Sequence, residues 1–77
     1  MTINVIFFGL LQDITSKDSL TLNDVKDTDS LLKILIQYYP SLPEYAYVIA
    51  VDRDLISTNT VLSDNSTVAL LPPYAGG

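Results

Sequence analysis

The chain has 77 residues, enough for one small domain. Nine acidic and four basic residues give it a formal net charge of −5, which argues against a nucleic acid partner. It contains no histidine, cysteine or tryptophan, so its side chains offer no imidazole base, thiolate nucleophile or usual transition-metal ligand, and we expect no bound metal or cofactor. Because no apolar stretch approaches the roughly 20 residues of a membrane span and no basic leader with a cleavage site opens the chain, we expect a soluble cytoplasmic protein that binds no membrane.

The first third of the chain predicts a strand, a short helix and a second strand. Residues 2–8, TINVIFF, form an apolar run rich in β-forming residues, and Gly9 ends it. Apolar residues at helical spacing indicate a turn or two of helix over residues 10–15. Leucines alternate with polar residues over 19–24, which predicts a second strand, antiparallel to the first.

The clearest predicted element is a helix over about residues 28–39. We expect Thr28 to be its N-cap, because a threonine hydroxyl can accept a hydrogen bond from a first-turn N–H. Pro40 cannot continue the helical hydrogen bonding and disfavours helix at the residue before it, so the helix ends there. The face expected to pack on the sheet carries apolar residues at helical spacing: Leu31, Leu32, Leu35, Ile36 and Tyr39.

The rest of the domain predicts two further strands, at residues 47–52 and 67–71. The segment between them is polar and rich in turn residues, with a short strand at 61–62. The order strand, strand, helix, strand, short strand, strand places one long helix across a mixed sheet. The pattern predicts an α+β domain of the β-grasp type over residues 1–71.

The last six residues predict a flexible, reactive C-terminal arm over 72–77. Pro72 and Pro73 lack N–H donors, so a sheet ladder cannot run through them, and consecutive prolines favour extended geometry. At roughly 3.3 Å per residue the arm reaches about 20 Å, enough to enter a partner's pocket. Gly76 and Gly77 have no Cβ, which lets the backbone pass a narrow slot. The functional group at the tip is the α-carboxylate of Gly77, an acyl donor once it is activated as a mixed anhydride.

Four segments carry a resemblance to a known family: FFG at the end of the first strand, YYP at the helix end, YVIAVD, and the ending VALLPPYAGG. With them, over nearly its full length, the chain resembles the MoaD family, the small sulfur-carrier subunit of molybdopterin synthase. It departs from that family at Asp52, where Asn is frequent, and at residues 65–67, where Gly-Asp-Glu is frequent. Both departures lie in turns away from the tip.

The resemblance implies a ubiquitin-like β-grasp fold and a sulfur-donor subunit without catalytic side chains of its own. A partner of the ubiquitin-activating type would use ATP to adenylate Gly77, and a sulfur-donating enzyme would convert it to a thiocarboxylate. The arm would then enter the large subunit of a heterotetrameric synthase, which supplies the active-site side chains, and give sulfur to cyclic pyranopterin monophosphate. In that arrangement Gly76 gives clearance, and the residues lining the inserted arm are Pro72, Pro73, Tyr74 and Ala75.

Three other functions are compatible with a terminal glycine pair. A thiamine-pathway sulfur carrier shares the fold, the glycines and the activation, and a ubiquitin-like modifier would end up linked to protein lysines. A plain interaction domain is the third. Phe8 and Leu70 are each candidates for an exposed docking patch or for the core.

Overall fold

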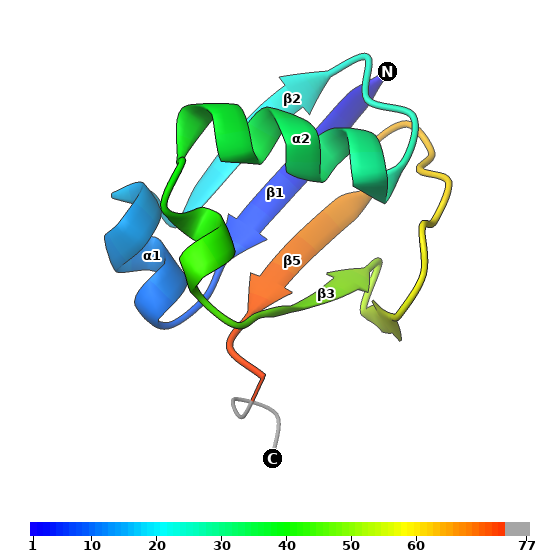
Figure 1. Ribbon diagram of the computed structural model, residues 1–77. Coiled ribbons are helices and arrows are strands. Elements are labelled where there is room, and N and C mark those ends of the chain that lie inside the picture. The colour runs from blue at the N-terminus through cyan, green and yellow to red at the C-terminus, as the bar shows by residue number, and fades with distance from the viewer. Residues whose placement is uncertain (74–77) are drawn as a thin grey trace.

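Five strands form one mixed sheet in the computed structural model, which describes residues 1–73 (Figure 1). The strand order is β2-β1-β5-β3-β4; β1 and β5 lie side by side at the centre and run parallel, and the other neighbouring pairs are antiparallel. The elements in chain order are β1 Thr2–Phe7, α1 Leu10–Thr15, β2 Ser19–Asn23, α2 Thr28–Tyr38, the 3₁₀ helix η1 Leu42–Glu44, β3 Val48–Val51, β4 Asp54–Ile56 and β5 Thr67–Leu71. The predicted mixed α+β sheet is confirmed, and α1 and η1 add two short helices to the long one.

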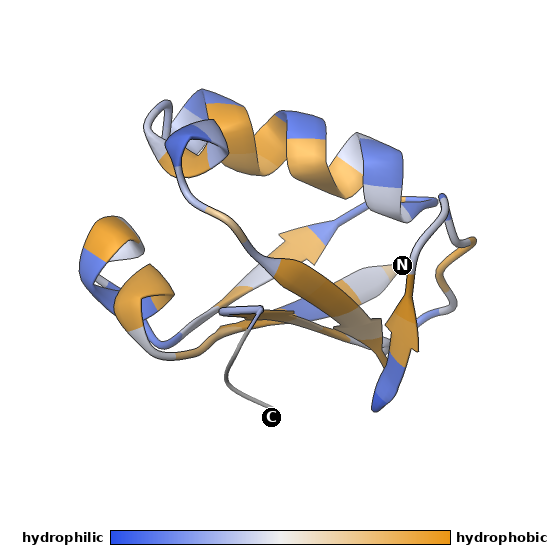
Figure 2. Cartoon of the chain, turned by 60° about the horizontal axis from the view of Figure 1, so that its bottom comes forward, coloured by the Kyte–Doolittle hydropathy of each residue, from blue (hydrophilic) through white to orange (hydrophobic). Residues whose placement is uncertain are grey.

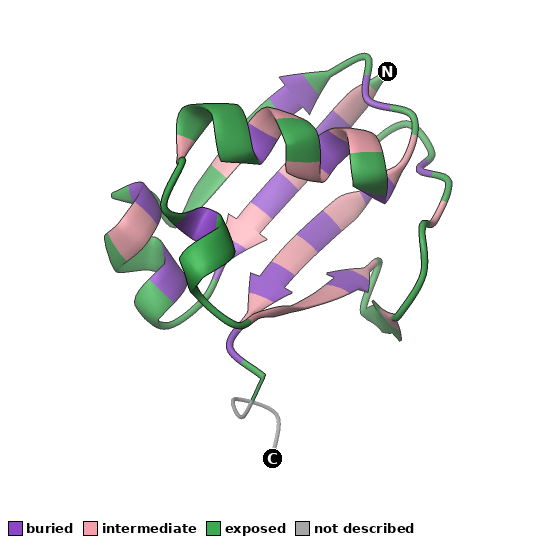
Figure 3. Ribbon diagram, viewed as in Figure 1, coloured by how far each residue is buried: buried purple, intermediate pink, exposed green. Residues whose placement is uncertain are grey.

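The hydrophobic core lies between α2 and one face of the sheet (Figures 2 and 3). Burial alternates along β1, where Ile3, Val5 and Phe7 are fully buried. The same alternation in β5 buries Val68 and Leu70, which pair with the β1 core residues across the parallel ladder. Leu70 is therefore a core residue. The opposite face of the sheet carries the intervening side chains.

The N-cap of α2 is Asp27, one residue before the predicted position. The Asp27 carboxylate accepts the Ser30 N–H at 2.9 Å, as an N-cap side chain does. Thr28 is the first helical residue and its hydroxyl is buried, donating to the Asn59 side-chain oxygen at 3.2 Å and accepting the Thr60 N–H at 3.0 Å. The prediction of Thr28 as N-cap is wrong because its hydroxyl bonds to a loop distant in sequence.

The buried face of α2 is narrower than predicted. Leu31 and Leu35 are fully buried and Ile34 packs against the core, whereas Ile36 is 37% exposed. Tyr39 follows the last helical residue, and its ring meets Phe7 edge to face at 6.1 Å between centroids. The stripe that faces the sheet therefore follows Leu31, Ile34 and Leu35.

The short strand β4 lies earlier than predicted. It pairs antiparallel with β3 through a two-residue turn, Asp52-Arg53, in which both residues have positive φ, 48° and 76°. Val61, expected in the short strand, makes only an isolated bridge with Asp27, and Leu62 beside it is buried in the core. The strand prediction at 61–62 is wrong because Leu62 packs as a core residue of a loop.

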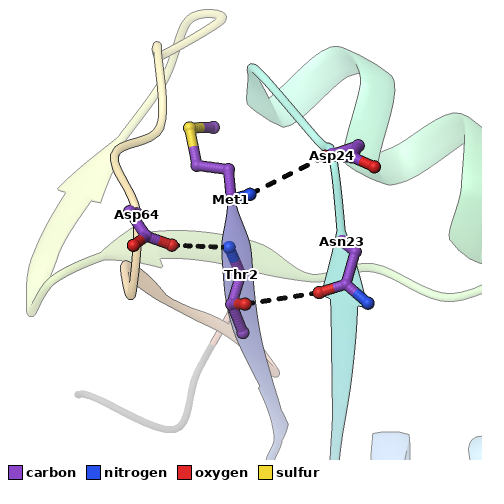
Figure 4. Close-up of polar contacts among 5 residues, drawn as sticks. All are labelled: Met1, Thr2, Asn23, Asp24 and Asp64. Atoms are coloured by element: carbon purple, nitrogen blue, oxygen red, sulfur yellow. Dashed lines mark hydrogen bonds and ion pairs between the residues drawn. The ribbon is translucent and has the colours of Figure 1, made fainter.

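The start of β1 is tied to the end of β2 and to the loops on either side (Figure 4). The Thr2 N–H donates to the Asp64 carboxylate at 2.7 Å, and the Thr2 hydroxyl donates to the Asn23 side-chain oxygen at 3.3 Å. The amino group of Met1 lies 3.7 Å from the Asp24 carboxylate. These contacts fix one end of the central strand, whose other end lies beside the end of β5. Within residues 1–73, no helix is long and apolar enough to cross a bilayer.

Candidate functional site

The base of the C-terminal arm lies at the centre of the sheet, where β1 and β5 both end. The Phe8 N–H donates to the Leu70 carbonyl at 3.1 Å, which continues the parallel pairing one residue past β1. Pro72 is buried and Pro73 is exposed. The other predicted site residues, Tyr74, Ala75, Gly76 and Gly77, lie outside the described residues, so their roles remain predictions.

The face of the sheet opposite α2 carries a shallow apolar hollow beside this point. Ile6, Ala69 and Ala50 lie opposite one another on three neighbouring strands, β1, β5 and β3. Because the two alanines are short and stand between larger neighbours, they leave a depression of about 500 Å³. Its lining residues are Ile6, Phe8, Ala50, Asp52, Arg53, Thr67 and Ala69. Phe8, 41% exposed, therefore belongs to a surface patch, whereas Leu70 does not.

One positive charge stands at the margin of the hollow. Asp52 is held by the next strand, since its carboxylate accepts the Thr67 N–H and its own N–H donates to the Thr67 carbonyl, both at 2.8 Å. Arg53 follows it in the turn and is the one basic residue of the lining. A partner that covers this face meets apolar surface bordered by the Asp52 carboxylate and the Arg53 guanidinium group, which favours an apolar anchor on that partner.

Among residues 1–73, two titratable groups have shifted pKa values, and neither lines the hollow. Hydrogen bonds from the side chain and backbone N–H of Ser30 lower the pKa of Asp27, and a bond from Asn59 adds to this. Burial raises the pKa of Tyr47. Both shifts follow from helix capping and packing. Within residues 1–73, no three acidic side chains gather as metal ligands.

Known proteins resemble this chain in both sequence and fold. A model of the ThiS family matches residues 5–77. The chain belongs to the ThiS family. Among curated relatives of this ThiS-family chain is the molybdopterin synthase sulfur carrier subunit of Mycobacterium tuberculosis. The two are 31% identical over an alignment 80 residues long, which covers 97% of this chain and 96% of that protein.

Solved structures extend the likeness to three dimensions. A chain in the complex of subunits 1 and 2 of molybdopterin-converting factor from Helicobacter pylori is 30% identical, with a TM-score of 0.73 and full coverage of both chains. The small archaeal modifier protein 1 of Methanosarcina acetivorans has a TM-score of 0.82 at 21% identity, covering 99% of this chain and 96% of that one, a likeness of fold alone. The ubiquitin-like β-grasp fold and the similarity to MoaD sulfur carriers are confirmed.

Sequence reasoning named Phe8 but missed the residues that shape the hollow. Ala69 alternates with buried residues in β5, and Ala50 stands between two β3 residues that pack against the core, so the period of two places both alanines on the outer face of their strands. That signal was present in the sequence. Arg53 had no comparable signal, because its place beside the hollow depends on the turn between β3 and β4.

Proposed function

We propose that this chain is the sulfur-carrier subunit of a molybdopterin synthase and works in the cytoplasm. The observation that carries the proposal is the 31% identity to the Mycobacterium tuberculosis sulfur carrier subunit, which extends over 97% of this chain. The Helicobacter pylori relative, 30% identical, was solved as a complex of two subunits, which supports a large subunit as the partner here.

In the proposed reaction the working group is the α-carboxylate of Gly77. An activating enzyme of the ubiquitin-activating type joins the carboxylate to AMP from ATP, with pyrophosphate as the leaving group. Hydrosulfide, delivered by a sulfur-donating enzyme, then attacks the carbonyl carbon and AMP leaves, which produces a thiocarboxylate and releases a proton. Inside the large subunit the thiocarboxylate gives its sulfur to cyclic pyranopterin monophosphate. This chain needs no catalytic side chain for these steps, because each partner supplies its own.

The position of the hollow supports docking and insertion as one event. Phe8 lines the hollow and also donates its N–H to Leu70, two residues before Pro72. A large subunit that covers the hollow therefore also holds the point where the arm leaves the sheet. In a synthase of two small and two large subunits, the arm of each small subunit would enter the large subunit to which that small subunit's domain is bound. Pro72, at the base of the arm, and Pro73, Tyr74 and Ala75 would line the inserted arm, and Gly76 would give it clearance.

The proposal is tested with a synthase reconstituted from this chain and its cognate large subunit. The wild-type chain is loaded by its activating enzyme, ATP and a sulfur source, and its conversion of cyclic pyranopterin monophosphate is compared with that of a chain extended by one residue after Gly77. We expect the extension to abolish conversion, because the terminal carboxylate moves from Gly77 to the added residue. Thermal unfolding should stay unchanged, because the folded domain is untouched.

Three other outcomes would count against the proposal, and two of them would assign a different function. Full conversion by the extended chain would contradict the proposal. Thiocarboxylate formation without conversion of the pterin by the large subunit would favour the thiamine-pathway carrier. Conjugates to protein lysines in place of the thiocarboxylate would favour the modifier.

A further inference from the structure

The first residue of the C-terminal arm packs against a glycine. A Cβ atom on Gly9 would lie 2.9 Å from Pro72 Cγ and 3.6 Å from Pro72 Cδ. Carbon atoms in ordinary contact lie about 3.5–4.0 Å apart, so the proline ring occupies space that a side chain at position 9 would need. Of the two arm residues that the structure describes, Pro72 is buried and Pro73 is exposed. The buried residue of the described arm is therefore the one that packs against Gly9.

The conformation of Gly9 is set by three elements that meet there. Its φ of 58° and ψ of −135° lie in a region that glycine alone adopts readily. On one side the Gly9 carbonyl accepts the Gln12 N–H at 3.0 Å as α1 begins. On the other side Phe8 is bonded to Leu70 of β5. Because β1, α1 and β5 all fix this junction, the surface that Gly9 offers to Pro72 is rigid.

We propose that Gly9 is a positioning residue for sulfur transfer: its missing side chain forms a seat for the Pro72 ring, and this seat sets the direction in which the arm leaves the domain. The inference rests on the proposed function, since it assigns the seat a role in bringing Gly77 to the large subunit's active site. Gly9 touches no reacting atom and acts through Pro72.

A proline suits this seat because its ring is part of the backbone. Cδ is bonded to the backbone nitrogen, so a push on the ring moves the main chain, whereas a flexible side chain would turn aside. A Cβ on Gly9 would displace the ring by roughly half an ångström or more to reach ordinary contact distance. Displacements of about 1 Å remote from the chemistry can slow a reaction by about 100-fold, because the reacting groups no longer meet in line.

The test is a double-mutant cycle on chains already loaded as thiocarboxylates, with single-turnover sulfur transfer measured at saturating large subunit. Gly9→Ala is expected to slow transfer by about 10- to 100-fold. Pro72→Ala alone is expected to slow it less, because the ring is lost without a collision. The variant with both changes is expected to match Pro72→Ala alone, since alanine at position 72 has no Cγ or Cδ for the new Cβ to meet.

A matched pair separates contact from backbone strain. Pro73→Ala also removes a proline ring, but from an exposed position, so combining it with Gly9→Ala should give the product of the two single effects. The seat has no positioning role if the effects of Gly9→Ala and Pro72→Ala on the transfer rate also multiply. The same conclusion follows if the Gly9→Ala chain transfers sulfur at the wild-type rate. Thermal unfolding of each variant reports strain separately, and a loss of stability alone would not change the saturated transfer rate of the folded chain.

One further measurement needs neither partner nor sulfur. In the isolated wild-type chain, nuclear Overhauser contacts are expected between the Gly9 α-protons and the Pro72 ring protons. Their absence would overturn the seat even if sulfur transfer proceeds. Their presence in a chain that forms no thiocarboxylate would leave the seat in place and reject the proposed function. Where Gly9→Ala does not fold, Pro72→Ala still tests the seat: unchanged transfer by that variant overturns it.

Discussion

Truncating Phe8 tests whether the hollow is the docking surface. A phenylalanine side chain covers roughly 200 Å², and Phe8 is 41% exposed, so about 80 Å² is left for a partner to bury. At about 25 cal/mol per Å² this amounts to ~2 kcal/mol. Because 1.4 kcal/mol corresponds to a tenfold change in Kd, we expect Phe8→Ala to weaken binding of the large subunit by about 10- to 30-fold.

The assay is isothermal titration of the cognate large subunit with each variant, and Ile36→Ala is the matched control. Ile36 is 37% exposed, close to the exposure of Phe8, but it lies on α2, which covers the other face of the sheet. Its truncation should leave Kd within about twofold, because the docking surface is untouched. Equal weakening by both substitutions, or unchanged binding by Phe8→Ala, would refute the assignment of the hollow.

The remaining predictions concern the fold that carries the arm. Leu35→Ala should cost about 2–5 kcal/mol in urea unfolding, because the side chain is fully buried, and a cost below about 1 kcal/mol would contradict its place in the core. Thr28→Val should cost about 1–3 kcal/mol by leaving the Thr60 N–H without its acceptor, and equal stability would show that the contact is dispensable. The folded chain lowers the pKa of Asp27 below its ordinary value of 3.8, so the unfolded state takes up the proton first and stability should fall as pH drops through this range. In Asp27→Asn this part of the pH dependence should vanish, and an unchanged slope of stability between about pH 5 and pH 2 would argue against the cap.

Much of the fold could be predicted because the spacing of apolar residues along a strand or helix decides which of its faces is buried. The alternation in β1 and β5 and the apolar stripe of α2 each indicate one core face, and together they indicate a β-grasp sheet. The N-cap was misplaced by one residue because Thr28 and Asp27 are both good capping residues, and only the bonds from Thr28 to Asn59 and Thr60 decide between them. Local sequence contains no trace of those bonds.

The site was less predictable, because it depends on pairing between distant strands. Phe8 and Leu70 are both apolar residues at strand ends. Leu70 pairs with the buried Phe7, so it faces the core, and Phe8, one residue further along, faces outward. The β3–β4 turn uses Asp52 and Arg53 at positive φ, without the Asn-Gly or Asp-Gly pair that usually signals such a turn. The sequence therefore offered no sign of where β4 begins, or that Arg53 borders the hollow.

The measurement that tests the account most directly is the intact mass of this chain, purified from its own cells without any tag at its C-terminus. Fragmentation then places any added mass on a residue. The account predicts a population heavier by the difference between sulfur and oxygen, with the change confined to Gly77. An added mass on any other residue, or a chain that stays unmodified when sulfur source, ATP and activating enzyme are all supplied, would contradict it.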